Sequence, residues 1–414
     1  MPYLLVILII MMAEYLLGVV VAVLNVLEAD PALPREFWWW YEPDRYALSQ
    51  SYLRDNTRFG LLIDTVGTPC MMAFVMFGGF NAVDQVARSH GYGPIVTGLI
   101  FSFLLLAGTR ILTLPVTLFR TFVMEARYGF NRTTFGTFLL DQVKAGLLAL
   151  VLGAPLLAGV LWFLEEAGSF AWLYSWLLVV AVQLAVMFVA PVWIMPLFNK
   201  FEPLGPGELR DAIEGYAREH GFSLKGVYTM DGSRRSTRAN AYFTGFGRHR
   251  RIVLFDTLVE KHTTPELVAV LAHEMGHYRL RHIPLGLAVS MATSCLMFYL
   301  LSLFIGNAGL AAAFGMQQVS VYASLVFFGF LFTPIDAVLG IFGNALSRRH
   351  EFAADAFAAR TTGTPEALID GLKRLTVDNL SNLTPHRLHV ALHYSHPPVL
   401  QRIAALRAQA GSKS

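Results

Sequence analysis

The sequence has few charged residues and almost no cysteine. Asp, Glu, Lys and Arg make up 15% of its 414 residues, against about 25% in a typical globular domain. Apolar residues make up 55% and the mean hydropathy is +0.50, so the chain cannot cover its surface with polar groups in water. The two cysteines, Cys70 and Cys295, both lie in apolar runs, which excludes a disulfide framework and a cysteine-rich metal site. The net charge of +3 is too small to predict a nucleic-acid partner, and membrane lipid is the expected surrounding.

Seven apolar stretches are long enough to cross a bilayer, which takes about 20 mostly apolar residues. The first stretch lacks a basic start and a small-residue cleavage site, so we interpret it as a retained span and not as a signal peptide. The sequence therefore predicts an α-helical, multi-pass integral membrane protein. Its spans are roughly 5–27, 60–83, 94–119, 145–164, 169–197, 283–305 and 319–345.

Connections rich in Lys and Arg alternate with connections that have almost none. The segments 28–59 and 120–144 hold four each, 198–282 holds thirteen and the tail from residue 346 holds nine, whereas the other connections hold one or none. Cytoplasmic connections carry the excess of basic residues. We therefore expect an amino terminus outside or in a lumen and a cytoplasmic carboxyl terminus. The membrane would be the inner membrane in a bacterium and the endoplasmic reticulum in a eukaryote.

Four ionisable residues lie within the predicted spans: Glu14, Asp64, Arg110 and Asp336. Charged groups at membrane depth usually face the interior of a helix bundle or a wet cavity. We therefore expect a polar space between the spans. The alternative is that Arg110 pairs with one of the acids and serves only to join two helices.

An aromatic run, Trp38-Trp39-Trp40-Tyr41, follows the first span. Such a run is typical of an anchor at the membrane–water interface. A surface that binds a hydrophobic substrate is the alternative interpretation.

The segment 200–282 has the composition of a globular α+β insert. A helix is predicted over 207–219, because Leu209, Ile213 and Tyr216 fall on one face at helical spacing. Thr264 and Pro265 predict the start of a second helix, with Thr264 as its N-cap, that runs to His282. Between the two helices we expect short strands at 226–230, 240–247 and 251–255, with a turn at Gly245 and Gly247.

The second helix carries the motif His273-Glu274-Met275-Gly276-His277. Residues four apart lie on one face of a helix, so both imidazoles can bind a single zinc ion. Zinc lowers the pKa of water, and the carboxylate of Glu274 is placed to take the proton as general base. The motif predicts one catalytic zinc per chain and a metalloendopeptidase.

A catalytic zinc normally has three protein ligands, and no third histidine follows at the compact spacing. Glu351 is the expected third ligand, and Asp355, four residues later on the same helical face, would hold the far nitrogen of a histidine ligand. Two spans separate His277 from Glu351, so the chain returns to the same side of the membrane and both residues can reach one ion.

These segments together resemble the type I CAAX prenyl endopeptidases, a family of integral-membrane zinc metalloproteases. The matching pieces are 231–246 (DGSRRSTRANAYFTGF), 251–258 (RIVLFDTL), HEMGH, 347–358 (SRRHEFAADAFA) and 393–402 (HYSHPPVLQR), in family order. The resemblance implies a peptide or protein substrate of the CAAX type, prenylated or similarly membrane-associated, and a chamber walled by the spans.

The resemblance also implies roles for residues outside the zinc motif. Asn240, Ala241 and Tyr242 match the edge strand that pairs with the substrate backbone. His396 and Arg402 match the wall of the active site, where Arg402 would contact substrate and His396 would stabilise the oxyanion. His393 is the competing candidate for the role of His396.

The expected organisation is five spans in 1–199, a cytoplasmic zincin-like insert in 200–282, two spans in 283–345 and a cytoplasmic segment in 346–414. One alternative function is that of a quality-control zinc protease that degrades damaged membrane proteins. A seven-span transporter or receptor with an inert zinc fold is the alternative from another class, although the intact His273, Glu274, His277 and Glu351 argue against it.

Overall fold

Long apolar helices form most of the molecule, which is described here by a computed structural model covering residues 2–222, 224–244 and 251–411. Within these residues seven helical segments are long and apolar enough to cross a membrane, so the predicted number of spans is confirmed. The expected turn at Gly245 and Gly247 lies outside the described residues. The seven segments are Pro2–Leu27, Pro43–Met76, Pro94–Glu125, Phe135–Glu166, Gly168–Phe198, His282–Ser302 and Val321–Thr362.

Four of these segments are single α-helices, and π-helical turns interrupt the other three. The uninterrupted helices are α1 (Pro2–Leu27), α2 (Pro43–Met76), α12 (His282–Ser302) and α14 (Val321–Thr362). The interrupted segments are α4 (Pro94–Phe119) with the π turn η2 (Arg120–Glu125), α5 (Phe135–Leu148) with η3 (Ala149–Gly153) and α6 (Ala154–Glu166), and α7 (Ala171–Val189) with η5 (Ala190–Ile194) and α8 (Met195–Phe198). Such π turns re-aim the side chains that follow them.

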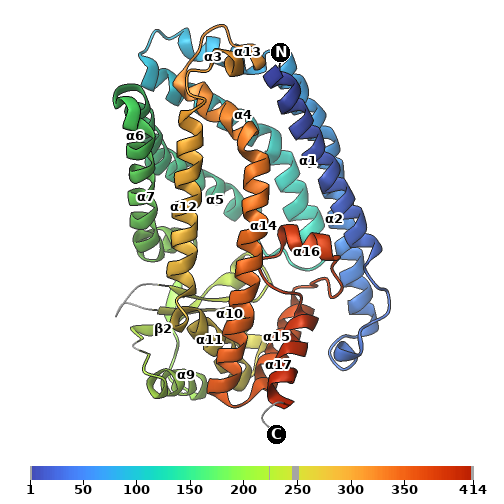
Figure 1. Cartoon of the computed structure of the whole chain (residues 1–414). Coiled ribbons are helices and arrows are strands. Elements are labelled where there is room, and N and C mark those ends of the chain that lie inside the picture. Colours follow the sequence, from blue (N-terminus) through green and yellow to red (C-terminus); the bar gives the residue numbers. More distant parts are fainter. Residues whose placement is uncertain (1, 223, 245–250, 412–414) are drawn as a thin grey trace.

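The spans stand side by side between two end layers (Figure 1). One end carries the amino terminus with the short helices α3 (Gly79–Arg88) and α13 (Ala308–Ala313). The other end carries the sheet and the helices α9 (Glu208–Glu219), α10 (Asp256–Lys261), α11 (Thr264–Arg279), α15 (Pro365–Asp378) and α17 (Val399–Gly411), and α16 (Arg387–His393) lies between α14 and α1. Segments with few basic residues thus share one end, and basic segments share the other.

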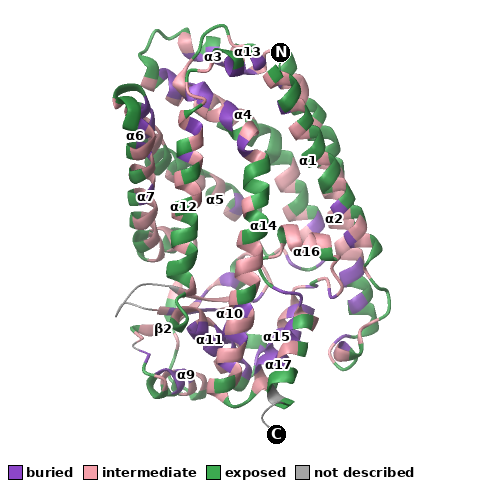
Figure 2. Ribbon diagram, in the orientation of Figure 1, coloured by how far each residue is buried: buried purple, intermediate pink, exposed green. Residues whose placement is uncertain are grey.

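Burial differs between the ends and the middle of the molecule. Figure 2 shows buried residues around α3 and α13 at one end and around α11, α15 and α17 at the other, while the middles of the spans are mostly exposed or half-buried. Within the most apolar window of each span, 6–17% of residues are buried. Protein packing therefore covers the ends, and the span surfaces are left for lipid or for a space between the helices.

The sheet has four strands in the order β1-β2-β4-β3. β2 (Gly226–Met230) and β4 (Arg251–Phe255) are parallel, whereas β1 (Phe201–Pro203) and β3 (Ala241–Thr244) lie antiparallel at the two edges. The strands expected at 226–230 and 251–255 are present as predicted, and β1 was not predicted. Ile252 and Leu254 are fully buried against Leu267 and Leu271 of α11, so the sheet packs on the helix that carries the zinc motif.

The last span continues well beyond the expected membrane boundary at residue 345. α14 is one helix of 42 residues, and it ends only at Gly363, whose φ of +67° terminates it. Arg348 and Arg349 lower the hydropathy, but arginine is a good helix former, so the helix outlasts the apolar run. Glu351 and Asp355 consequently lie on the same rigid helix as the seventh span.

The helix with the zinc motif begins one residue earlier and ends three residues earlier than expected. Its N-cap is Thr263 and not Thr264, because Glu266 closes a capping box with Thr263 and accepts a hydrogen bond from its backbone N–H at 3.0 Å. The helix does not run to His282. It ends at Arg279, and Arg281 adopts a left-handed conformation (φ +58°, ψ +32°) before α12 begins at His282.

The four ionisable residues within the spans are all exposed. Arg110 donates a hydrogen bond at 2.8 Å to the amide oxygen of Gln142. The interpretation that Arg110 pairs with one of the acids is therefore wrong, since a neutral amide takes that place. Because lipid-facing charges are costly, their exposure favours a polar space between the spans.

The aromatic run after the first span is divided between the protein interior and the surface. Trp40 packs beside Lys373 and Arg374 of α15, and Tyr41 is buried in the core shared with α11 and α15. Trp39 is 95% exposed and Trp38 is 57% exposed. Only these two tryptophans are free to act as an interfacial anchor.

Candidate metal centre

Two histidines and one glutamate from two helices converge beside the sheet. The Nε2 atoms of His273 and His277, one turn apart on α11, lie 3.1 Å from each other. Glu351 of α14 brings Oε1 to 3.2 Å from His277 Nε2 and Oε2 to 3.5 Å from His273 Nε2. Within the described residues these three form the group of side chains able to hold a metal ion, with ligand atoms within 4.8 Å of one another.

This group has the spacing and chemistry of a metal site. Ligand atoms about 2.0–2.2 Å from a tetrahedral metal ion lie about 3.3–3.6 Å from one another, and the separations of 3.1, 3.2 and 3.5 Å between the three side chains are close to that range. Glu351 Oε2 is buried and makes no hydrogen bond to any described residue. Its closest contacts are ionic, with Arg402 Nη1 at 3.4 Å and His273 Nε2 at 3.5 Å, and a bound cation would find this buried oxygen able to serve as a ligand. Two imidazoles and one carboxylate are a ligand set suited to zinc.

A glycine within the motif allows the two helices to meet. A Cβ atom added to Gly276 would lie 3.1 Å from Ala354 Cα and 3.2 Å from the Ala354 carbonyl oxygen. α11 therefore touches the backbone of α14 at this point, between Glu351 and Asp355 in sequence. The close approach is what brings the carboxylate of one helix to the imidazoles of the other.

Asp355 links the metal-binding group to a buried arginine. Its Oδ1 lies 2.8 Å from His273 Nδ1, and Arg402 donates from Nε to Oδ2 at 2.8 Å and from Nη2 to Oδ1 at 2.6 Å. Burial lowers the pKa of His273, but the carboxylates of Asp355 and then Glu351 outweigh burial and raise the pKa to about 9. A metal ion entering the site therefore displaces a proton at neutral pH.

Glu274 follows His273 on α11 and is half-buried. Burial raises the pKa of this carboxyl above its ordinary value, although the two neighbouring imidazoles act in the opposite direction. A raised carboxyl pKa brings it closer to neutral pH, which suits a group that must both take and give a proton.

His393 is the last residue of α16, and His396 lies on the segment that joins α16 to α17. His396 Nε2 is 3.5 Å from Glu351 Oε1, and its Nδ1 is 3.0 Å from Ser395 Oγ. His393 is exposed and packs its ring against His389 at 4.9 Å between centroids. The structure thus brings His396 and not His393 to the metal ligands.

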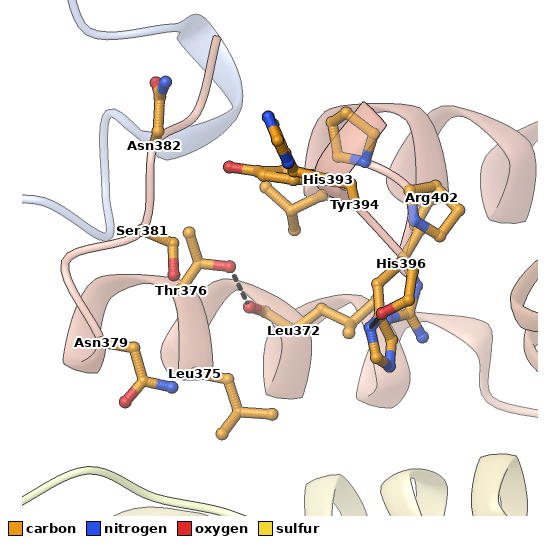
Figure 3. A pocket seen from close by; sticks show the side chains of 14 residues that line it. Leu372, Leu375, Thr376, Asn379, Ser381, Asn382, His393, Tyr394, His396 and Arg402 are labelled. Carbon is orange, nitrogen blue, oxygen red and sulfur yellow. Dashed lines mark hydrogen bonds between the residues drawn. The ribbon is translucent and has the colours of Figure 1, made fainter. Parts of the chain in front are cut away.

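Both histidines line a cavity of about 490 Å³ between α15 and this segment. Figure 3 shows His396 and Arg402 together at one end of the cavity and Asn379, Ser381 and Asn382 at the other. The cavity therefore has one end next to the metal ligands, since His396 Nε2 lies 3.5 Å from Glu351 Oε1. Its wall is neutral and polar at the end away from them.

Ala241 and Tyr242 begin strand β3 at an edge of the sheet, and Asn240 immediately precedes it. One side of β3 pairs with β4, and β3 also contacts α11. The Asn240 carbonyl accepts a hydrogen bond from Phe255 N–H at 3.0 Å. An extended peptide added to the outer side of β3 would run beside the helix that carries His273 and His277.

Ion pairs fix the loop that leads into this strand. Arg235 donates to both carboxylate oxygens of Asp141 on α5, at 2.8 and 3.0 Å. Arg238 pairs with Glu125, the last residue of the π turn η2, at 3.1 Å. The edge strand is therefore held in position by two of the spans.

Arg402, expected to contact substrate, binds the carboxylate of Asp355 and also lines the cavity. It is only 8% exposed and both of its hydrogen bonds to Asp355 are buried. Its Nη1 lies 3.4 Å from Glu351 Oε2. Arg402 thus contacts two carboxylates of the site, those of Asp355 and Glu351.

Sequence reasoning missed two histidines. His282 lies 3.0 Å from His277, Nδ1 to Nδ1, and its ring stacks on that of His350 at 4.0 Å between centroids. The proximity of His350 to Glu351 in sequence was a visible signal. The sequence does not predict the position of His282. The helix break at Arg281 turns His282 back toward His277, and neither a glycine nor a proline at that position marks the break.

The chain matches known families along nearly its whole length. Residues 23–200 match the family described as CAAX prenyl protease N-terminal, five membrane helices, and residues 203–410 match peptidase family M48. The CAAX prenyl protease 1 homolog of Mus musculus is 33% identical over 92% of this chain and 90% of its own. That of Arabidopsis thaliana is 34% identical over 91% and 90%, and the CAAX prenyl protease 1 of Saccharomyces cerevisiae is 32% identical over 88% and 86%.

A crystal structure of S. mikatae Ste24p has the same fold, with a TM-score of 0.93, 30% identity and coverage of 98% of this chain and 99% of that one. The chain thus matches the five-helix family over residues 23–200 and the M48 family over residues 203–410, which argues against the alternatives of an inert receptor and of a quality-control protease. The chain belongs to peptidase family M48 and, within it, to the type I CAAX prenyl endopeptidases, which makes it a multi-pass integral-membrane metalloendopeptidase.

Proposed function

We propose that the metal is a single zinc ion and that the substrates are CAAX-type peptides, prenylated or otherwise membrane-associated, cut near their carboxyl terminus. The observation that carries the proposal is the convergence of His273, His277 and Glu351 beside an edge strand. This group lies at the end of the helix bundle that carries the sheet. The relatives that cover most of this chain bear the name CAAX prenyl protease 1, which supports the substrate class.

His273, His277 and Glu351 would hold the zinc ion, and Asp355 would fix the orientation of His273. When bound, the zinc supplies a Lewis acid that polarises the scissile carbonyl and lowers the pKa of water. Glu274 takes the proton of the attacking water and delivers it to the leaving amine. Its raised pKa suits both steps.

His396 would stabilise the negative charge that develops on the carbonyl oxygen. Its Nδ1 lies 3.0 Å from Ser395 Oγ, and its Nε2 faces the metal ligands. A donor held in place before the reaction begins needs no reorganisation as charge appears. Arg402 would act through Asp355 and not by touching the substrate.

The substrate peptide would bind as an additional strand along the outer side of β3. Backbone hydrogen bonds to Asn240, Ala241 and Tyr242 would give affinity independent of side chains, as strand addition generally does. The ion pairs of Arg235 and Arg238 would hold this strand in register with the metal.

We further propose that the amino terminus lies outside or in a lumen and that the sheet, the metal ligands and the carboxyl terminus lie in the cytoplasm. The end of the molecule that carries α11, α15 and α17 also carries most of the basic residues, and basic residues stay on the cytoplasmic side. The insert 200–282 and the segment from 346 would then form one cytoplasmic unit.

The test uses full-length protein purified in detergent, assayed for zinc content and for cleavage of a farnesylated CAAX peptide. The native protein should contain one zinc per chain and cut the peptide. Glu274→Gln should keep the zinc and lose turnover, and Glu351→Ala should lose most of the zinc. The non-farnesylated peptide of the same sequence measures how much of the recognition depends on lipid. A native protein that contains no zinc, or that cuts neither peptide, would contradict the proposal.

A further inference from the structure

The two histidine ligands are each held by a second residue, but by different chemical groups. His273 Nδ1 faces the carboxylate of Asp355 at 2.8 Å. His277 Nδ1 faces His282 Nδ1 at 3.0 Å. In both rings Nε2 points into the metal-binding group, so in both rings Nδ1 is the nitrogen left for an outer partner.

The His277–His282 contact requires one proton between two nitrogens. A histidine that binds metal through Nε2 carries its remaining proton on Nδ1. His277 Nδ1–H is therefore the donor, and His282 Nδ1 must be the acceptor. His282 is then a neutral imidazole with its proton on Nε2.

The backbone at Arg281 makes this contact possible. In an unbroken helix residues five apart point about 140° away from each other around the axis, so His282 could not reach His277. The left-handed conformation of Arg281 ends α11 and turns His282 back. A positive φ at a residue other than glycine is unfavourable and is kept where the surroundings require it.

His350 restricts the ring of His282 from the other side. The two imidazoles are stacked with 4.0 Å between centroids and 5° between planes. His350 immediately precedes Glu351 on α14, so the helix that supplies the third ligand also supplies this stacking partner. His282 is thus fixed by a backbone turn on one side and by a ring on the other.

We infer that His282 is a positioning residue for the metal site, holding His277 by accepting its Nδ1 proton, with His350 as the support of the His282 ring. This inference rests on the proposed zinc site. Residues that hold a histidine ligand typically contribute 10–100-fold in metal affinity. His282 and His350 would do for His277 what Asp355 and Arg402 do for His273.

The experiment measures the zinc dissociation constant of the full-length protein by competition with a chelator. His282→Leu removes the acceptor and should weaken zinc binding about 10–100-fold. His282→Asn places an amide oxygen where Nδ1 lies and should restore affinity to within about threefold of the native value. His90→Leu, at the opposite end of the molecule, is the control and should change nothing.

Two further variants reach the same contact without altering His282. Arg281→Val disfavours the left-handed turn and should weaken zinc binding, whereas Arg281→Gly permits the turn and should not. His350→Ala should weaken zinc binding, and His350→Phe, which keeps a flat ring, should weaken it less. In the His282 and His350 variants the Tm without zinc should stay native, whereas the strained turn of Arg281→Val also lowers the zinc-free Tm. In every weakened variant the rise in Tm on adding zinc should shrink.

The outcomes separate this inference from the proposed function. Native zinc affinity in His282→Leu overturns the inference, while Glu351→Ala and Glu274→Gln still test the zinc site itself. Equal losses in His282→Leu and His282→Asn would also overturn it, because the hydrogen bond would not be what matters. A lower Tm in zinc-free His282→Leu, with its zinc affinity kept, would assign His282 to packing alone.

Discussion

Arg402 grips both carboxylate oxygens of Asp355, with Nε donating to Oδ2 at 2.8 Å and Nη2 to Oδ1 at 2.6 Å. The pair is almost completely buried, and Asp355 also faces His273. A two-point contact of this kind fixes the plane of the carboxylate, and through it the plane of the imidazole. The orientation of one ligand is thereby set by α17, the last helix of the described chain.

Arg402→Lys should weaken zinc binding by about tenfold or more, because lysine keeps the charge but loses the two-point geometry. Chelator competition measures the loss. Arg407→Lys is a matched control on the same helix, since Arg407 pairs with Glu36 at the surface. Equal zinc affinities for the two variants would show that the charge alone suffices.

His396→Ala should lower kcat by about 10²–10³ with zinc content unchanged, because removing one oxyanion donor typically costs that much. His393→Ala should cost far less, since the ring of His393 packs on His389 and not on the metal ligands. Steady-state cleavage of one CAAX peptide by both variants decides the matter. The reverse ranking would assign the oxyanion role to His393.

Gly276→Ala should destabilise the protein by about 1–3 kcal/mol, as overpacking generally does, because the new methyl group meets the Ala354 backbone. The Tm and the zinc affinity should both fall, since α11 and α14 would separate. Gly215→Ala is the control: Gly215 lies in α9 with nothing within 4 Å of its added Cβ. That variant should raise the Tm slightly.

Asp141→Asn should raise KM several-fold while leaving zinc content native, because it weakens the pair that fixes the loop before β3. The substrate strand would then align less well with an intact metal site. Glu214→Gln removes the partner of Arg210 in an exposed pair and serves as the control. A loss of zinc in Asp141→Asn would mean that this pair supports the metal site and not the strand.

Reporter fusions test the sidedness of the molecule. Fusions after residues 90 and 312 should report the outside or lumen, and fusions near residues 240 and 410 should report the cytoplasm, as the distribution of basic residues requires. The structure has residues 90 and 312 at one end (Figure 1). Opposite signals from these two positions would contradict both the topology and the fold.

The spans and the pairing of His273 with His277 were predictable because each leaves a strong local pattern. An apolar run must be about as long as the bilayer is thick, and two histidines on one helical face need only a spacing of four. Glu351 was predictable once an even number of spans returned the chain to the same side. The strands at 226–230 and 251–255 were predicted with the bounds that the structure shows.

The remaining features depend on contacts that a sequence does not display. Hydropathy marks the apolar part of a helix and not the end of the helix, so the seventh span was expected to end at residue 345, whereas α14 continues to Thr362. The left-handed turn at Arg281 carries no glycine to mark it. The role predicted for Arg402 came from the family resemblance. The structure shows that Asp355 is its hydrogen-bond partner, which the sequence did not indicate.

The length of α14 also bears on the order in which the protein is made. Translation produces His273 and His277 before the last two spans, and Glu351 only after them, at the far end of the seventh span's own helix. A chain that stalls or inserts wrongly before that point has the general base and two ligands but no third. With Glu351 as the proposed third ligand, hydrolytic activity would appear only once the final span is in the bilayer. Correct membrane insertion would then act as the safeguard that other proteases obtain from a removable propeptide.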